Sequence, residues 1–140
     1  MGKLDYQLID HTADLGVEVY GADLRSLFKN AALVLFELIL SGQSPESAKP
    51  IEISLEAIDL PDLMVRWLSE LLYIFEGEKR VVKDVEVVDI QDKNLYAQIY
   101  TIPYRDKYFQ IENEIKAVTY HQLEIGRQDK RWYARIIFDL

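Results

Sequence analysis

The sequence predicts an α+β fold with two layers, in which two amphipathic helices pack on one face of a mainly antiparallel β-sheet. Two segments repeat apolar residues at steps of three and four, which is typical of one buried helix face. Several others alternate apolar and polar residues, as half-buried strands do. Residues 80–140 contain only strand-like segments joined by hairpin-like turns, and such turns join antiparallel strands.

The first part of the chain predicts two strands followed by a helix. Residues 6–10 form a short apolar run, and residues 15–21 alternate between apolar and polar side chains. Asp23 can cap a helix whose apolar face runs through residues 24–39, because an aspartate at that position accepts a hydrogen bond from an early helical N–H. Ser41 and Gly42 are expected to end this helix.

The middle of the chain predicts a third strand and a second helix. Residues 51–57 alternate again, so they are expected to form a half-buried strand. Asp59 and Pro61 lie in the expected first turn of the helix, where a capping carboxylate and a proline are both favourable. Gly77 is expected to end the helix.

The remaining residues predict two hairpins. Residues 80–90 and 94–104 meet at Asp92, Lys93 and Asn94, and residues 114–125 and 131–140 meet at residues 126–130. The large aromatic side chains are expected in the core, namely Trp67, Trp132, Tyr120 and Phe138.

The composition of the chain limits the kinds of function that it can have. A chain of 140 residues is a comfortable single domain, so we expect one domain over residues 1–140. Cysteine is absent, which excludes thiolate catalysis and thiolate zinc sites. The net charge of −8 argues against tight nucleic-acid binding by this chain alone, because phosphate binding needs a basic surface. No apolar run suits a membrane helix or signal peptide, so we expect a cytoplasmic protein with no membrane partner.

Strand alternation indicates a candidate site. It places Asp14, Lys116 and Asp139 on strand faces directed away from the core, whereas His121 falls on an apolar face. If Leu140 ends the chain, its α-carboxylate lies one residue beyond Asp139. Several negative groups at one strand end would repel each other unless a cation lay between them, and oxygen donors suit a hard divalent ion.

Each of these residues also has an ordinary structural interpretation. Asp139 can be a solvated terminal residue, and Lys116 an exposed strand lysine. His11 either bridges the turn beside Thr12 or contributes to a site, and His121 can be a core or interface histidine. No phosphate-cradling glycine loop, nucleophile elbow or HExxH helix is present, so no motif for stand-alone catalysis appears.

Four stretches together resemble the archease family. They are "DHTADLGVEVYGADLRSLFKNAALVLFELI" near the start, "VRWLSELLYIFE" in the second helix, "EIKAVTYHQLEI", and the ending "WYARIIFDL". The resemblance covers nearly the whole chain in order and at plausible spacing. One departure is Asn113, which stands where the family pattern leads us to expect a glycine, and it concerns only the local turn.

The resemblance implies an accessory protein rather than an enzyme. Archeases activate the RtcB-type RNA ligase of tRNA splicing and RNA repair: they promote its guanylylation and multiple turnover, and they broaden its nucleotide use. An alternative is a chaperone-like modulator of a tRNA methyltransferase. A small metal-dependent hydrolase is a third hypothesis, but no general base or second metal set is evident.

The resemblance also implies roles for particular residues. The family's metal ligands match Asp14, Asp139 and Leu140, with Ca²⁺ the first choice of ion and Mg²⁺, Mn²⁺ and Zn²⁺ as alternatives. The signature lysine matches Lys116, which with Asp14 and Asp139 would serve activation, and His11 is a further candidate.

Overall fold

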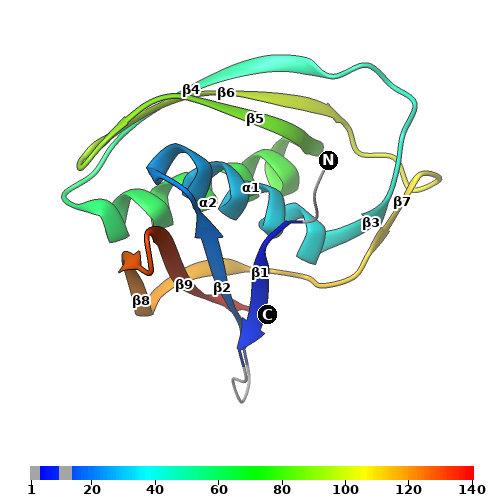
Figure 1. Cartoon of the computed structure of the whole chain (residues 1–140). Coiled ribbons are helices and arrows are strands. Elements are labelled where there is room, and N and C mark those ends of the chain that lie inside the picture. Colours follow the sequence, from blue (N-terminus) through cyan, green and yellow to red (C-terminus); the bar gives the residue numbers. More distant parts are fainter. Residues whose placement is uncertain (1–3, 10–13) are drawn as a thin grey trace.

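Two helices lie between two antiparallel sheets in the computed structural model, which describes residues 4–9 and 14–140 (Figure 1). A further pair of short strands forms a separate two-stranded sheet. In chain order the elements are β1 (Tyr6–Ile9), β2 (Leu15–Gly21), α1 (Leu24–Ile39), β3 (Leu40–Gly42), β4 (Lys49–Glu56), α2 (Leu60–Glu78), β5 (Arg80–Gln91), β6 (Asn94–Pro103), β7 (Phe109–Ile111), β8 (Ala117–Gln128) and β9 (Arg131–Asp139).

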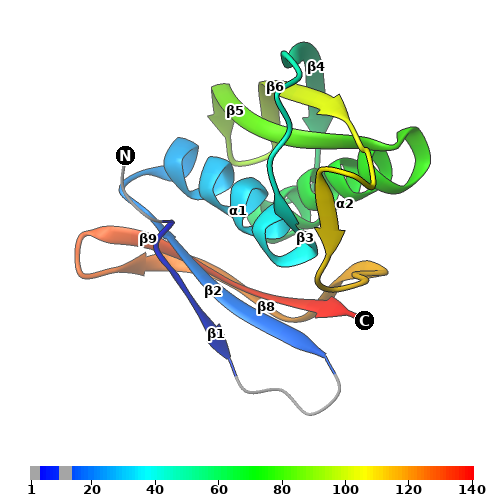
Figure 2. The same ribbon diagram turned by 90° about the vertical axis from the view of Figure 1, so that its right-hand side faces the viewer.

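The strands divide among separate sheets. The larger sheet has the order β1-β2-β9-β8, the second has the order β4-β6-β5, and β3 pairs with β7; every pairing is antiparallel. The α+β class, the antiparallel strands and the two amphipathic helices are thereby confirmed. The arrangement differs from the two expected layers in one respect, because sheet lies on both sides of the helices (Figure 2).

The helix surfaces explain this third layer. Helix α1 buries the later part of the expected stripe, namely Leu27, Phe28, Ala31, Leu35, Leu38 and Ile39. It also buries Ala32, Val34 and Phe36, which lie outside that stripe. An apolar surface wider than one stripe is covered only when a helix has neighbours on more than one side. Both helices accordingly contact strands of both sheets.

The helix ends follow the sequence closely. Asp23 accepts a hydrogen bond from the backbone N–H of Ser26 at 2.8 Å, and Asp59 accepts one from the N–H of Asp62 at 2.9 Å. Both aspartates are N-caps, as expected. Helix α2 ends at Glu78, one residue after the expected glycine, and Lys79 follows in the left-handed conformation with φ 58°.

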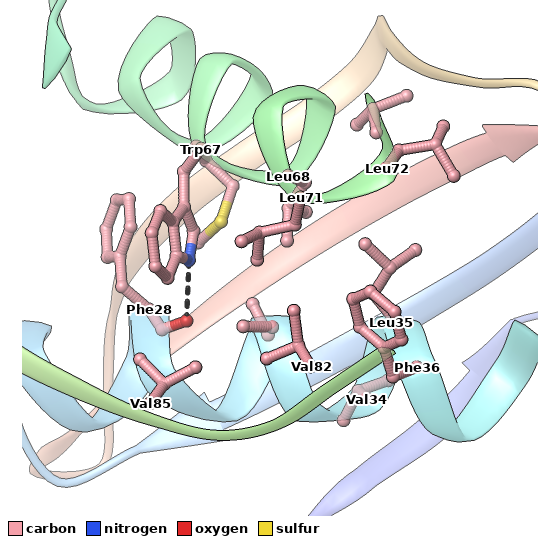
Figure 3. Packing of buried hydrophobic residues seen from close by; sticks show 14 of the residues in the cluster. Phe28, Val34, Leu35, Phe36, Trp67, Leu68, Leu71, Leu72, Val82 and Val85 are labelled. Atoms are coloured by element: carbon pink, nitrogen blue, oxygen red, sulfur yellow. Dashed lines mark hydrogen bonds between the residues drawn. The ribbon is translucent and has the colours of Figure 1, made fainter. Parts of the chain in front are cut away.

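Trp67 anchors the two helices to each other. Its side chain is fully buried, and its indole N–H donates a hydrogen bond to the carbonyl oxygen of Phe28 at 2.9 Å (Figure 3). Leu68, Leu71 and Leu35 pack beside it in the main hydrophobic cluster. The buried N–H therefore has a partner, so this large side chain lies in the core without leaving a donor unpaired.

Strand β8 departs from simple alternation. Thr119 pairs with Ile137 and Glu124 pairs with Arg135, so residues 120–123 form a bulge opposite a single residue of β9. Bulges of this kind bend a strand and redirect its side chains.

The bulge makes the predicted parity of β8 wrong in its first half. Val118 is buried opposite Phe138 in the core, whereas Ala117 lies on the outer face opposite Asp139. Beyond the bulge, Ile125 faces inward as expected. His121 is exposed in the bulge rather than on an apolar face, and Tyr120 is 60% exposed rather than in the core.

Candidate acidic site at one end of the larger sheet

Strand pairing brings the start of β2 beside the end of β9. β9 lies between β2 and β8, with Leu15 paired to Phe138. Asp14 directly precedes Leu15 and Asp139 directly follows Phe138, so the two aspartates come at the same end of adjacent strands. Figure 2 shows the start of β2 and the end of β9 at one end of this sheet.

Lys116 joins the same end from the other side. Its backbone N–H donates a hydrogen bond to the carbonyl oxygen of Asp139 at 2.8 Å, one residue before β8 begins. The side chains of Lys116 and Asp139 are exposed, Asp14 is half-buried, and Leu140 is 46% exposed. Lys116 therefore reaches this position through the pairing of β8 with β9, and not through the parity expected from its sequence.

This end of the sheet combines carboxylate oxygens with one basic side chain, that of Lys116. Asp14 and Asp139 supply carboxylates, and a chain that ends at Leu140 adds an α-carboxylate next to them. Such donors suit a hard divalent ion. Within residues 4–9 and 14–140, no three His, Cys, Asp or Glu side chains gather as a group that could hold a metal. His11 lies outside the described residues.

Farther along the same outer face, the charged side chains already pair with one another. Arg135 donates to Glu18 at 3.1 Å, and the Tyr20 hydroxyl donates to the same carboxylate at 2.8 Å. The Arg131 guanidinium lies 3.8 Å from the centre of the Tyr20 ring. These cross-strand contacts stabilise the sheet and engage Glu18 away from the acidic end.

The sequence pattern did not indicate the buried carboxylate of Asp62. Asp62, 5% exposed, accepts hydrogen bonds from the Tyr120 hydroxyl at 2.6 Å, Arg66 Nε at 2.9 Å and the Ile58 N–H at 3.1 Å. These donors, with Tyr120 the largest influence, lower the pKa of Asp62 to about 2. The spacing of Asp62 and Arg66 on one helix was a visible signal, whereas the tyrosine from the β8 bulge was not.

Comparisons with known proteins agree with this architecture. The model of the archease protein family matches residues 6–140. The chain belongs to the archease family. A curated archease of Methanosarcina barkeri is 39% identical, with 96% of this chain and 95% of that protein covered. An archease of Archaeoglobus fulgidus is 34% identical, with 98% of this chain and 100% of that protein covered.

Solved structures of similar fold extend the comparison. The solution structure of Methanobacterium thermoautotrophicum protein 1598 has a TM-score of 0.70 at 32% identity, and the match covers 96% of this chain and 98% of that one. The crystal structure of an archease from Thermotoga maritima has a TM-score of 0.65 at 20% identity, over 94% of each chain, and shows the fold alone. Neither helix in the part of this archease that the structure describes is long and apolar enough to cross a membrane.

Proposed function

We propose that this archease-family protein is a non-enzymatic activator of an RtcB-type RNA ligase in the cytoplasm, acting in tRNA splicing and RNA repair. In this role it promotes guanylylation and repeated turnover of the ligase and broadens the nucleotides that the ligase accepts. The supporting observation is that Asp14, Asp139 and Lys116, far apart in the sequence, come to one end of one sheet. Family membership supplies the partner class.

In this proposal the acidic end holds a divalent cation. Asp14, Asp139 and the α-carboxylate of a chain ending at Leu140 are the ligands, with Ca²⁺ the first choice and Mg²⁺, Mn²⁺ or Zn²⁺ as alternatives. The bound ion would supply positive charge toward the nucleotide phosphates in the ligase. The pairing of β2 with β9 keeps the carboxylates at one end of the sheet. The Lys116 ammonium group contacts a phosphate or a carboxylate of the ligase.

The charge of the chain agrees with an action exerted through a partner. At −8, the protein offers little attraction for RNA phosphates, so RNA contacts are left to the ligase. The acidic end is also partly exposed, since Asp139 and Lys116 both reach solvent. Exposed groups at a strand end are accessible to a partner protein without any rearrangement of the core.

A reconstituted ligase assay tests the proposal. We expect Asp14→Asn and Asp139→Asn each to reduce stimulation of guanylylation and turnover by about tenfold or more, as loss of a metal-site residue commonly does. Lys116→Ala should also reduce stimulation, because it removes the proposed contact with the ligase. Asp92→Asn and Lys93→Ala are matched controls, because both residues are exposed in the hairpin between β5 and β6 of the other sheet. Equal stimulation by site and control variants would refute the assignment of the site.

A second candidate function is a chaperone-like role toward a tRNA methyltransferase. The archease structure from Thermotoga maritima is described as a possible chaperone. On this chain, exposed apolar side chains such as Leu8 at 61% and Ile58 at 73% are accessible to an unfolded partner. If Asp14→Asn and Asp139→Asn suppress methyltransferase aggregation as well as the unchanged protein does, the chaperone role does not depend on the acidic site.

A further inference from the structure

A cavity of about 530 Å³ adjoins the acidic end of the larger sheet. It lies among the ends of α1 and α2 and residues 111–116, which lead into β8. Its buried and half-buried lining is mainly apolar, including Leu72, Phe75, Tyr104 and Ile115. A concave apolar surface of this size is typical of a site that receives a ligand or a partner's side chain.

Local contacts hold the walls of the cavity in place. The Phe75 and Tyr104 rings meet edge to face with centroids 5.8 Å apart, and Tyr104 stacks on Phe109 at 5.9 Å. Also in the lining, the Asn113 side-chain amide donates a hydrogen bond to the carbonyl oxygen of Leu38 at 2.6 Å. The cavity is therefore preformed, which lowers the entropy cost of binding.

The rim of the cavity carries charges that cancel. Glu76, Lys79, Glu114 and Lys116 are its exposed charged residues, two acidic and two basic. A nucleotide would bring several negative charges to a rim with no net positive charge, on a chain of net charge −8. A polypeptide segment with an apolar side chain and mixed polar neighbours fits both the apolar walls and this rim.

We propose that this cavity receives an apolar side chain from an extended segment of the RtcB-type ligase, and that it serves as the anchor of the complex. This inference rests on the proposed function. Lys116 supports that occupant, because it lines the cavity and its backbone N–H donates a hydrogen bond to the carbonyl oxygen of Asp139 at 2.8 Å. A ligase that binds the acidic end therefore lies beside the cavity. Buried apolar anchors of this kind dominate the energy of many interfaces.

Substitutions of Ile111 test the proposed anchor. It lines the cavity and is 39% exposed, so a charge there alters the cavity with little effect on the core. Val88 in β5 is also 39% exposed and does not line the cavity, which makes it a matched control. Ile111→Glu and Val88→Glu form one pair, and Ile111→Ala and Val88→Ala form a second pair that introduces no charge.

Two measurements on the complete chain and the ligase separate anchoring from activation. We expect Ile111→Glu to raise the Kd for the ligase by about tenfold or more, as loss of an anchor does, with stimulation at saturation close to the unchanged protein. Ile111→Ala should weaken binding less, and both Val88 variants should bind normally. Asp139→Asn should instead lower stimulation at saturation. Thermal unfolding checks that each variant is folded.

Three other outcomes would overturn the anchor. If the unchanged protein stimulates the ligase and the Ile111 variants match the Val88 variants, the anchor is refuted while the proposed function stands. If the unchanged protein neither binds nor stimulates the ligase, both proposals fail. If the isolated chain binds GTP by calorimetry and Ile111→Glu abolishes that binding, the cavity is a nucleotide site instead.

Discussion

At the scale of single residues, Asp62 shows how a buried carboxylate becomes part of a fold. It is almost inaccessible to solvent, and each of its oxygens accepts a hydrogen bond from a different part of the chain. Burial alone would favour its neutral form, but the donors favour the charged form more strongly. Asp62 thereby ties the start of α2 to the β8 bulge through Tyr120.

This network predicts a specific acid dependence of stability. The pKa of Asp62 is about 2 in the folded protein and close to 4 in an unfolded chain. Its contribution is therefore present above about pH 4 and is lost as the pH falls toward 2. The free energy of unfolding of Asp62→Asn, measured with urea between pH 5 and pH 2, should converge on that of the unchanged protein at the acid end. A constant difference across this range would contradict the assignment, and Asp92→Asn serves as a control.

At the scale of elements, the hairpin between β8 and β9 is tighter than the sequence predicts. The strands continue to Gln128 and from Arg131, which leaves a turn of two residues, Asp129 and Lys130. Both are left-handed, with φ 53° and φ 69°. Such a turn matches the twist of the paired strands, but it imposes a steric cost on any residue with a Cβ atom.

The turn geometry predicts a stabilising substitution. Lys130→Gly should raise the free energy of unfolding by about 0.5 kcal/mol, because relief of the left-handed conformation outweighs the added freedom of the unfolded chain. Lys93→Gly in the other hairpin is the contrast, since Lys93 is not among the residues with positive φ. It should be neutral or destabilising. Chemical denaturation of both variants checks this, and a loss of stability in Lys130→Gly would contradict it.

At the scale of the whole molecule, the candidate site depends on the order of strands in one sheet. β9, the last strand, lies between β2 near the start of the chain and β8. This order places Asp14 and Asp139 at the ends of neighbouring strands, although they are far apart in the sequence. The site therefore exists only when the larger sheet is complete.

The proposed α-carboxylate ligand predicts the effect of an extension after Leu140. In a chain that ends at Leu140, a short Gly-Ser extension removes this ligand, so it should weaken ligase stimulation while the melting temperature stays unchanged. The same extension placed before Met1 is the control. The reconstituted ligase assay and thermal unfolding provide the two measurements. Equal stimulation by the two extended proteins would remove the terminal carboxylate from the proposed ligand set.

Much of the local structure follows from the sequence. The caps at Asp23 and Asp59 and the two amphipathic helices are read directly from residue type and spacing, because helix ends and faces depend on residues within a few positions of each other. The hairpin at Asp92 and Lys93 is equally local. The resemblance to the archease family rested on such short stretches, and the comparisons confirmed it.

The division into separate sheets, the β8 bulge and the Asp62–Tyr120 contact were decided only by the tertiary structure. Alternation wrongly placed Ala117, Thr119 and His121 on the core face, because a bulge reverses the faces of a strand without a clear local signal. Alternation did select Asp14 and Asp139, but it could not show that they come to the same end of adjacent strands. That placement depends on which strands pair, and pairing is set by the burial of a shared core among segments distant in the sequence.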